Sequence, residues 1–275
     1  MSRSVTLLLV LAAAVVLVPF SSAAQTLSIG SGPSAPPIDV RAERGIEWLR
    51  GERIIRAIGD VRALRGDLEV RADVLSAHYR ERADGNTEVW RVVGDGNVRI
   101  TTPSETAYAD KGVYDLDSAV VVLSGATPVR LVTAEAEVTA DRQIEFRPET
   151  QTLVAQGNAI AVKGDSRLKA ETLTAHFSRE TGEGSRLKRV EAAGDVHLTT
   201  PNEVLRADRG VYDLETGIAS LLGSVRITRG ENQLNGCRAE IDMNAGRSKI
   251  FGCGPGEDGG RRVRGLIQPE AVPKN

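Results

Sequence analysis

The sequence predicts an all-β fold built from stacked repeats, and three observations carry this prediction. Residues 59–125 align with residues 157–223 without a gap at an offset of 98, and 25 of these 67 positions are identical. Self-similarity at a fixed period is typical of stacked supersecondary units. Short segments such as residues 98–100 (Val-Arg-Ile) alternate apolar and polar side chains, which is the period of half-buried strands. Finally, glycine pairs with Asp or Asn recur between these segments, as turns between strands require.

The first element in chain order is a secretory signal peptide, expected at residues 1–24. Arg3 provides the positive charge, residues 5–18 an apolar run, and Ser22-Ala23-Ala24 a small-residue cleavage site. The run is shorter than the roughly 20 residues that a spanning helix needs. We therefore expect cleavage and export, and retention as an inner-membrane anchor is the alternative.

The folded body is expected at residues 38–253, between two low-complexity segments. Residues 25–37 form a flexible Gly/Ser/Pro leader, and residues 254–275 a disordered tail that contains Gly and Arg. The repeat divides the body into two sets, residues 38–155 and 156–253. We expect about 20 short strands in the body, closed by turns at Gly59-Asp60, Gly66-Asp67, Asp84-Gly85, Gly157-Asn158, Gly164-Asp165 and Gly194-Asp195.

A finer repeat of about 30 to 38 residues lies inside the larger one. Each unit runs Gly-x-Val-x-Leu/Ile and then reaches an Ala-Asp or Ala-Glu step. A small Ala at a fixed place in every layer fits close stacking of backbones. The six predicted steps are Ala72-Asp73, Ala109-Asp110, Ala136-Glu137, Ala170-Glu171, Ala207-Asp208 and Ala239-Glu240.

Charge and cysteine content narrow the class of protein. With 35 basic and 37 acidic residues the chain lacks the basic excess of a nucleic-acid binder. Cys237 and Cys253 are the two cysteines, and after export we expect them either to form a disulfide or to remain thiols. Two thiols do not make a structural zinc site, which needs four ligands. We predict no metal and no cofactor.

The repeated carboxylates do not indicate an enzyme. Asp73, Asp110 and Asp208 recur beside turns, where such side chains usually accept hydrogen bonds from the backbone. Active sites usually depend on residues that occur once, whereas the best-matched residues here occur twice. This pattern favours a scaffold, a conduit or a binding surface.

At this point the residues resemble a known family. The segments 96–98 (Gly-Asn-Val) and 109–116 (Ala-Asp-Lys-Gly-Val-Tyr-Asp-Leu) are similar to the OstA-type repeat of LptA/OstA-like lipopolysaccharide-transport proteins. Residues 37–43 (Pro-Ile-Asp-Val-Arg-Ala-Glu) resemble the first strand of that family. The resemblance covers residues 37 to 253. The chain departs from the simplest members because its repeat set is duplicated.

The resemblance implies an elongated antiparallel β-jellyroll, or β-taco, in the periplasm. Its apolar groove would hold the acyl chains of lipopolysaccharide while other Lpt proteins, LptC-like and LptD-like, pair with its edge strands. A head-to-tail homo-oligomer is also implied. The physics of open sheets agrees, because an edge strand carries unpaired N–H and C=O groups. The alternatives are a structural β-solenoid and a repeat-built carbohydrate-active enzyme of the cell envelope.

The resemblance also points to groove residues. They occupy the inward positions of the first strand and the aromatic or apolar close of each repeat, and the alternative is that they only fill a packed core. The candidates are Ile38, Val40, Tyr79, Tyr114, Leu116, Phe177, Tyr212 and Leu214.

Overall fold

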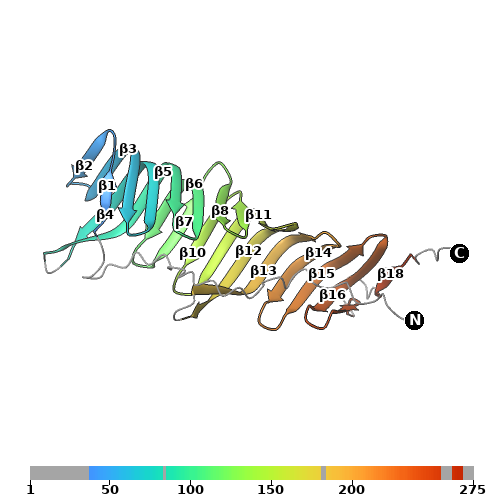
Figure 1. The fold of residues 1–275 in the computed structure, drawn as a ribbon. Coiled ribbons are helices and arrows are strands. Elements are labelled where there is room, and N and C mark those ends of the chain that lie inside the picture. The colour runs from blue at the N-terminus through green and yellow to red at the C-terminus, as the bar shows by residue number, and fades with distance from the viewer. Residues whose placement is uncertain (1–36, 83–84, 181–183, 255–261, 269–275) are drawn as a thin grey trace. The chain divides into compact units, whose positions relative to one another are not determined.

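The computed structural model describes residues 37–82, 85–180, 184–254 and 262–268 (Figure 1). The predicted signal peptide, nearly all of the leader and most of the tail lie outside these residues. The described chain forms eighteen strands and no helix. The described residues therefore contain no helix that is long and apolar enough to cross a membrane. The strands are β1 (Asp39–Arg41), β2 (Gly45–Leu49), β3 (Ile54–Arg65), β4 (Leu68–Glu81), β5 (Thr87–Thr101), β6 (Glu105–Asp115), β7 (Val120–Ser124), β8 (Val129–Thr133), β9 (Glu137–Ala140), β10 (Gln143–Arg147), β11 (Thr152–Lys163), β12 (Ser166–Glu180), β13 (Gly184–Thr199), β14 (Val204–Asp213), β15 (Ile218–Arg229), β16 (Asn232–Asp242), β17 (Arg247–Phe251) and β18 (Arg264–Leu266).

The described residues fall into two compact units. The first unit contains residues 37–161 and the described part of 176–186, and the second contains 162–175 and the described residues from 187 onward. Strands β1 to β10 therefore lie in the first unit and β14 to β18 in the second. Consecutive long strands run side by side within each, as β3 to β6 do in the first (Figure 1).

Each long strand of the first unit belongs to two layers. Strand β2 pairs with residues 54–58 of β3, whereas β1 pairs with residues 62–64 of the same strand. At the other side, β7 pairs with residues 111–115 of β6 and β8 with residues 105–108. We call the layer that contains β2, β7 and β10 layer A and the layer that contains β1, β8 and β9 layer B. We call each level, whether one bent strand or two short ones, a rung.

The second unit repeats this plan. Strands β13 to β16 pair in sequence, β17 pairs with residues 238–242 of β16, and β18 pairs with residues 233–235. Layer A of this unit therefore ends at β17 and layer B at β18. All described registers in both units are antiparallel, which confirms the predicted all-β antiparallel jellyroll built from stacked repeats.

The long strands bend at corners made by the glycine pairs. Gly96 and Asn97 have φ values of 76° and 49° and lie inside β5, where the register with β6 shifts between Asp95 and Val98. Two residues thus oppose one on the neighbouring strand, which is a β-bulge that turns the chain from one layer to the other. The same pair of positive φ angles recurs at Gly59-Asp60, Gly157-Asn158, Gly194-Asp195 and Gly223-Ser224.

This placement corrects part of the strand prediction. Gly59-Asp60, Gly157-Asn158 and Gly194-Asp195 lie within β3, β11 and β13 and do not end them. The strands are consequently longer than expected, up to 16 residues in β13. Gly66-Asp67, by contrast, does join β3 to β4. Positive φ serves a bulge as well as a turn, so the two look alike in sequence.

The acidic residue of the Ala-Asp step holds the corner of the following rung. The Asn97 amide donates to Asp73 at 2.9 Å, and the backbone N–H groups of Ala126 and Thr127 donate to Asp110 at 2.7 and 2.9 Å. These bonds lower the pKa of Asp110, with those from Thr127 contributing most. The carboxylate lies so close that a Cβ on Gly96 would stand 2.9 Å from the Cγ of Asp73.

The registers move two of the predicted Ala-Asp/Glu steps. In β9, Ala140 lies opposite the buried Val129, so the step there is Ala140-Asp141 and the prediction of Ala136-Glu137 was wrong. In β16, Gly236 lies opposite Val225, so Gly236-Cys237 takes the place predicted for Ala239-Glu240. Cys237 therefore stands where other rungs carry the acidic residue.

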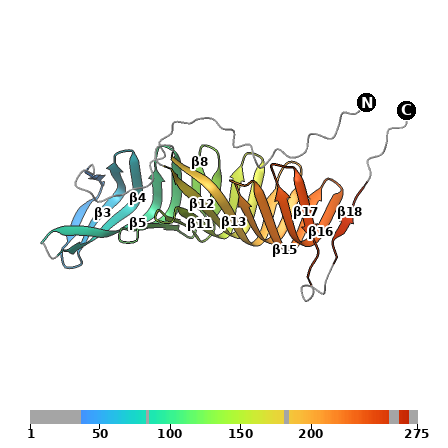
Figure 2. The same cartoon turned by 90° about the horizontal axis from the view of Figure 1, so that it is seen from below.

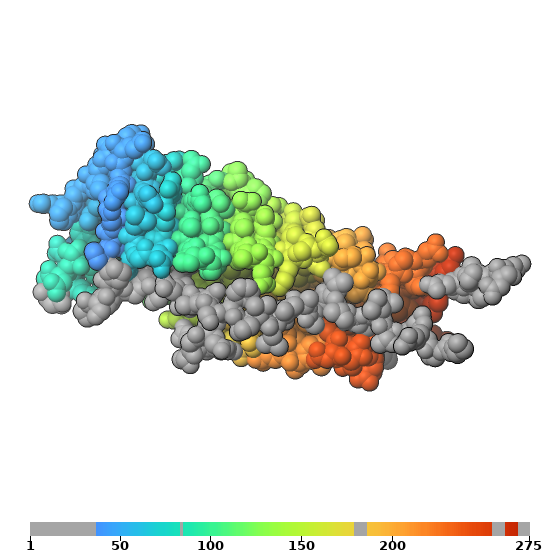
Figure 3. All heavy atoms as spheres, in the orientation of Figure 1, coloured from blue at the N-terminus to red at the C-terminus, as the bar shows by residue number. Residues whose placement is uncertain are grey.

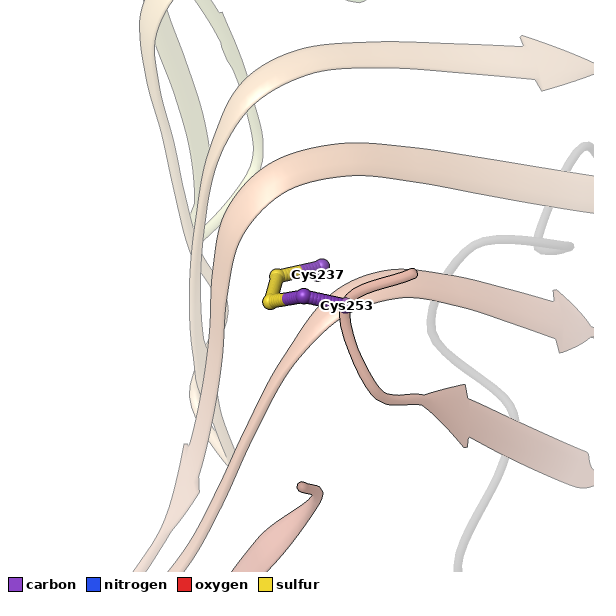
Figure 4. The surroundings of a disulfide bond; sticks show 2 residues. All are labelled: Cys237 and Cys253. Carbon is purple, nitrogen blue, oxygen red and sulfur yellow. A yellow bond between two sulfur atoms is a disulfide. The ribbon is translucent and has the colours of Figure 1, made fainter. Parts of the chain in front are cut away.

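A disulfide joins Cys237 to Cys253 at the last corner (Figure 4). The two Cα atoms are 5.0 Å apart and the residues are 16 apart in sequence. Cys253 follows β17, between the layer A and layer B parts of the final rung. The covalent bond thus occupies the place that a carboxylate contact has at Asp73 and Asp110.

The repeat also begins earlier than the sequence alignment indicated. The N–H groups of Glu43 and Arg44 donate to Gly59 and Ile58, and those of Asp141 and Arg142 donate to Gly157 and Gln156. These two sets of bonds are related by the same offset of 98. The β1–β2 rung is therefore the counterpart of the β9–β10 rung.

The core of each unit sits at the corners. Val61 and Val129 are fully buried, and Ala140 and Val225 are 1% exposed. In the next row of the same face of layer B, Val70, Ile100 and Leu131 are half-buried, and the smaller Ala63 and Ala107 are buried. We call this face, which carries the corner core, the inner face of each layer. Burial on it declines from the corner outward.

Candidate functional site

The inner face of layer A in the first unit carries a continuous cross-strand row. Side chains directly opposite in antiparallel strands share a face, so printed registers connect the row residue by residue. Most of its members are half-buried, and Val121 is buried. In order across the strands the row is Trp48, Ile55, Ala77, Val92, Tyr114, Val121, Phe146 and Leu153.

Layer B of the same unit carries a matching row. All of its side chains are apolar, and only Ala63 and Ala107 are buried. The row consists of Val40, Ala63, Val70, Ile100, Ala107, Leu131 and Val138. Because the strands bend at the corner, the inner faces of both layers belong to the same folded sheet and line its concave side.

The second unit has the same two rows. In layer A the registers connect Val190, Tyr212, Ala219 and Ile241. In layer B they connect Leu198, Leu205, Ile227 and Leu234. Strands β15 and β16, which carry the last two members of each row, lie side by side in the view from below (Figure 2). The apolar lining is therefore a property of the repeat and not of one strand.

The structure places the Tyr-x-Leu pairs on these inner faces. Tyr114 lies between Val92 and Val121, and Tyr212 lies between Val190 and Ala219. Burial raises the pKa of both phenols, and the positive charge of Arg65 partly opposes this at Tyr114. Leu116 and Leu214 follow as half-buried residues, and their N–H groups donate to Trp90 and Lys188.

The other predicted residues have different surroundings. Tyr79 is 7% exposed, and its hydroxyl accepts a 2.9 Å hydrogen bond from the indole of Trp48, so its ring packs within the fold. Phe177, its counterpart, is half-buried. Val40 lies in the layer B row, and Ile38 is exposed just before β1.

Sequence reasoning missed several members of the rows. Phe146 is the clearest, because it extends the layer A row and lies at the offset of 98 from Trp48. Extending the alignment to the N-terminal side of residue 59 would have found this pair. Val92 recurs as Val190 at the same offset, whereas Val121 had no signal beyond apolar alternation.

Charged residues appear on the inner face of layer B one step beyond the apolar row. In the second unit, Arg229 follows Ile227 on that face, and Glu203 precedes Leu205. Their side chains form an ion pair at 2.9 Å. In the first unit Glu105 takes the place of Glu203 and lies opposite Thr133. Burial raises the pKa of Glu105.

Outer-face charges are mostly engaged with one another. Glu69 contacts both Arg62 and Arg71, at 2.9 and 2.5 Å, and Asp117 contacts Arg80 at 2.7 Å. Throughout the part of the chain that the structure describes, no group of three or more His, Cys, Asp or Glu side chains is arranged to hold a metal ion.

The end strands present apolar side chains to solvent. β1 and β2, in blue, lie at one end of the first unit (Figure 3). Ile46 and Trp48 of β2 are 54% and 60% exposed although they belong to inner-face positions opposite Ala57 and Ile55. At the end of the second unit, Leu266 of β18 is 63% exposed and lies opposite Gln233, on the other face from Leu234. The apolar inner face of the first unit thus continues to its end strand β2.

A family model agrees with this architecture. The model described as LptA/(LptD N-terminal domain) LPS transport protein matches residues 46–142 and again residues 137–247. The chain belongs to this family. Its two matches follow the two copies of the 98-residue repeat, and members of the family are described as transport proteins.

Two individual relatives were compared with the chain. An uncharacterised protein of Rhizobium meliloti (strain 1021) is 23% identical over 117 residues, which is 41% of this chain and 63% of that protein. The chain thus matches less than two thirds of that relative's length. The crystal structure of LptH, the LptA-homologous periplasmic component of the lipopolysaccharide transport device of Pseudomonas aeruginosa, is 17% identical with a TM-score of 0.42. That comparison covers 49% of this chain and 95% of LptH.

Proposed function

We propose that this protein binds lipopolysaccharide in the periplasm and forms part of the bridge that carries it from the inner to the outer membrane. The observation that supports this most is the pair of apolar rows on the inner faces of both units, which are mostly half-buried in the first unit and partly buried in the second, in a chain from this family. Acyl chains need extended apolar surface and no particular polar group. Burial of each methylene contributes about 0.8 kcal/mol.

The proposed role is that of a carrier and not of an enzyme, and it needs no cofactor. The recurring carboxylates Asp73 and Asp110 are occupied at the corners, where they accept hydrogen bonds. A structural β-solenoid would pack its interior fully, whereas Tyr114 and Phe146 are half-buried. These observations favour the carrier over the structural and carbohydrate-active alternatives.

The exposed ends suggest where protein partners bind. We propose that LptC-like and LptD-like proteins, or a second copy of the chain head to tail, pair with the end strands β1–β2 and β17–β18. Ile46 and Trp48 would then continue the apolar inner face into the partner. Sedimentation velocity of the wild type and of Ile46→Asp tests this, and identical association of both would count against it.

Export is the remaining part of the proposal. Cleavage before Gln25 would release the chain into the periplasm, and N-terminal sequencing of the protein from the cell envelope checks this. A mature chain that still begins near residue 1 would instead support the inner-membrane anchor.

Site-specific photocrosslinking in intact cells tests the binding face. A photoreactive amino acid replaces Tyr114 or Phe146 on the inner face, and Lys111 of the same strand β6 provides an outward control that is 51% exposed. Lipopolysaccharide adducts are expected from the two inward positions and not from Lys111.

The opposite outcome is equally clear. If neither inward position yields an adduct while the substituted proteins fold and accumulate normally, the inner faces do not carry the lipid. Equal labelling at Lys111 would mean that the lipid contacts the protein without preference for the inner face.

A further inference from the structure

Arg229 is a cation at the limit of the apolar inner face of the second unit. On β15 the side chains of Val225 and Ile227 are buried and that of Arg226, between them, is exposed. Arg229 is the next residue on the same face as Val225 and Ile227. Glu203 stands just before β14, next to the register pair Val204 and Thr228, and two residues before the buried Leu205. The two form an ion pair whose side chains are 41% and 21% exposed. The pair therefore marks the outer limit of the layer B apolar row.

The guanidinium of Arg229 has hydrogen-bonding capacity left over. Nη2 donates to Glu203 at 2.9 Å, while Nε is buried and has no partner in the structure. A guanidinium presents five N–H donors in a fixed fork that fits carboxylate and phosphate oxygens. Glu203 accepts from Nη2, and the Arg229 side chain is 41% exposed, so an anionic group can contact the N–H donors on the exposed part of the guanidinium.

The fold itself does not require this arginine. At the equivalent place in the first unit, Thr133 lies opposite Glu105, and no cation pairs with that carboxylate among the described residues. Both units nevertheless form the same corner and the same apolar rows. Arg229 is thus an addition to the repeat, as is expected of a residue with a binding role.

We propose that Arg229, held in place by Glu203, binds a phosphate group on the sugar headgroup of the transported lipid at the limit of the second unit's apolar face. The first unit has Thr133 at the equivalent place and lacks this contact there. The inference rests on the proposed function and adds a specificity determinant to it. Glu203 is a positioning residue, since it acts through Arg229.

Two substitutions give each unit the residue that the other has at this place. Arg229→Thr gives the second unit the residue of the first, and Thr133→Arg does the reverse next to Glu105. Arg229→Lys keeps the charge and removes the planar fork. Each full-length variant is titrated with purified lipopolysaccharide and with the same material after enzymatic removal of its phosphates, with binding measured by calorimetry.

We expect Arg229→Thr to weaken binding of the phosphorylated lipid about tenfold or more, the usual size for loss of a charged hydrogen bond. Binding of the dephosphorylated lipid should not change. Arg229→Lys should fall between, and Thr133→Arg should strengthen binding of the phosphorylated form. Excess inorganic phosphate should compete little, because it lacks the acyl chains that supply most of the affinity; full competition would mean that the site binds free phosphate and would overturn the proposal.

The design separates two kinds of failure. If the wild type binds both lipids and Arg229→Thr binds both equally well, only the role of Arg229 is overturned. If the wild type binds neither lipid, the proposed function is overturned as well. Should Arg229→Thr fold poorly because Glu203 is left unpaired, the double variant Glu203→Gln/Arg229→Thr removes both charges and takes its place in the same titrations.

Discussion

The two units follow one plan and differ at two places. Corners of the first unit are held by carboxylates such as Asp110, whereas the last corner of the second unit is held by the Cys237–Cys253 disulfide. On the inner face, the first unit has a lone Glu105 and the second an Arg229–Glu203 ion pair. The differences show which parts of the repeat serve the fold and which are free to change.

The difference at the corners has a physical reason. Asp110 accepts from the backbone of Ala126 and Thr127, which lie between two further strands, β7 and β8, of the same unit. The final rung pairs with another rung on one side only, so fewer contacts hold its corner residues in place. A covalent bond keeps such a rung in place where hydrogen bonds alone would fray.

Removal of the disulfide should have the largest effect on stability. We expect Cys237→Ser/Cys253→Ser to lower the free energy of unfolding of the second unit by about 3 kcal/mol, as for other loops of this size. Native-state hydrogen exchange should show the loss at β17 and β18, while β3 to β6 keep their protection. Unchanged protection of β17 would mean that strand pairing alone holds the end rung.

A methyl group at a corner should come next. In Gly96→Ala the new Cβ would meet Asp73, and φ would remain near 76°. We expect a loss of about 1 to 3 kcal/mol, typical of strained backbone positions, measured by chemical denaturation. Gly66→Ala is the matched control, because Gly66 also has positive φ but nothing within 4 Å of the added Cβ. Equal losses of stability in the two variants would show that the carboxylate of Asp73 is not the cause.

Neutralising a corner carboxylate should have a smaller, pH-dependent effect. The pKa of Asp110 is lowered in the folded state, so its stabilisation is present above the ordinary aspartate pKa and is lost as the pH falls through the lowered value. Asp110→Asn should therefore lower the free energy of unfolding at pH 7. In strong acid, where Asp110 of the wild type is protonated, the variant and the wild type should be equally stable. Denaturation curves at both pH values check this, and a pH-independent difference would contradict it.

The smallest effect is expected at the inner-face carboxylates, and its sign should differ between units. Burial raises the pKa of Glu105, so its charged form costs stability at neutral pH and the cost disappears as the pH falls through the raised pKa. Glu105→Gln should raise the melting temperature slightly at pH 7. Glu203→Gln should lower it, because Arg229 loses its partner. Shifts of the same sign would show that the two sites are not electrostatically different.

Much of the fold was predictable because the repeat makes each signal appear twice. The family resemblance implied an inward position for Tyr114 and Tyr212, and the registers place both on the inner face. Strand boundaries were less predictable, since Gly96-Asn97 has the composition of a turn but bends a continuous strand. Only the register distinguishes the two cases.

The site was less predictable than the fold. Phe146 lies 98 residues after Trp48, but the repeat was recognised only from residue 59 onward, so the two positions were not matched. Arg229 gave no signal, since a residue absent from the other copy does not appear in a repeat. Cys237 was noticed as a cysteine, but its equivalence to Asp73 depends on the shift in register between β15 and β16.

The corner contacts all point the same way along the chain. Asp73 holds Asn97, Asp110 holds Ala126 and Thr127, and Cys237 is bonded to Cys253, so the holding group always precedes the corner that it holds. When a chain is made or threaded from its N-terminus, each partner is already available as the next corner emerges. Neighbouring rungs are also neighbours in sequence, so only short loops have to close. The architecture therefore suits vectorial folding, in which the sheet lengthens rung by rung and the disulfide closes it last.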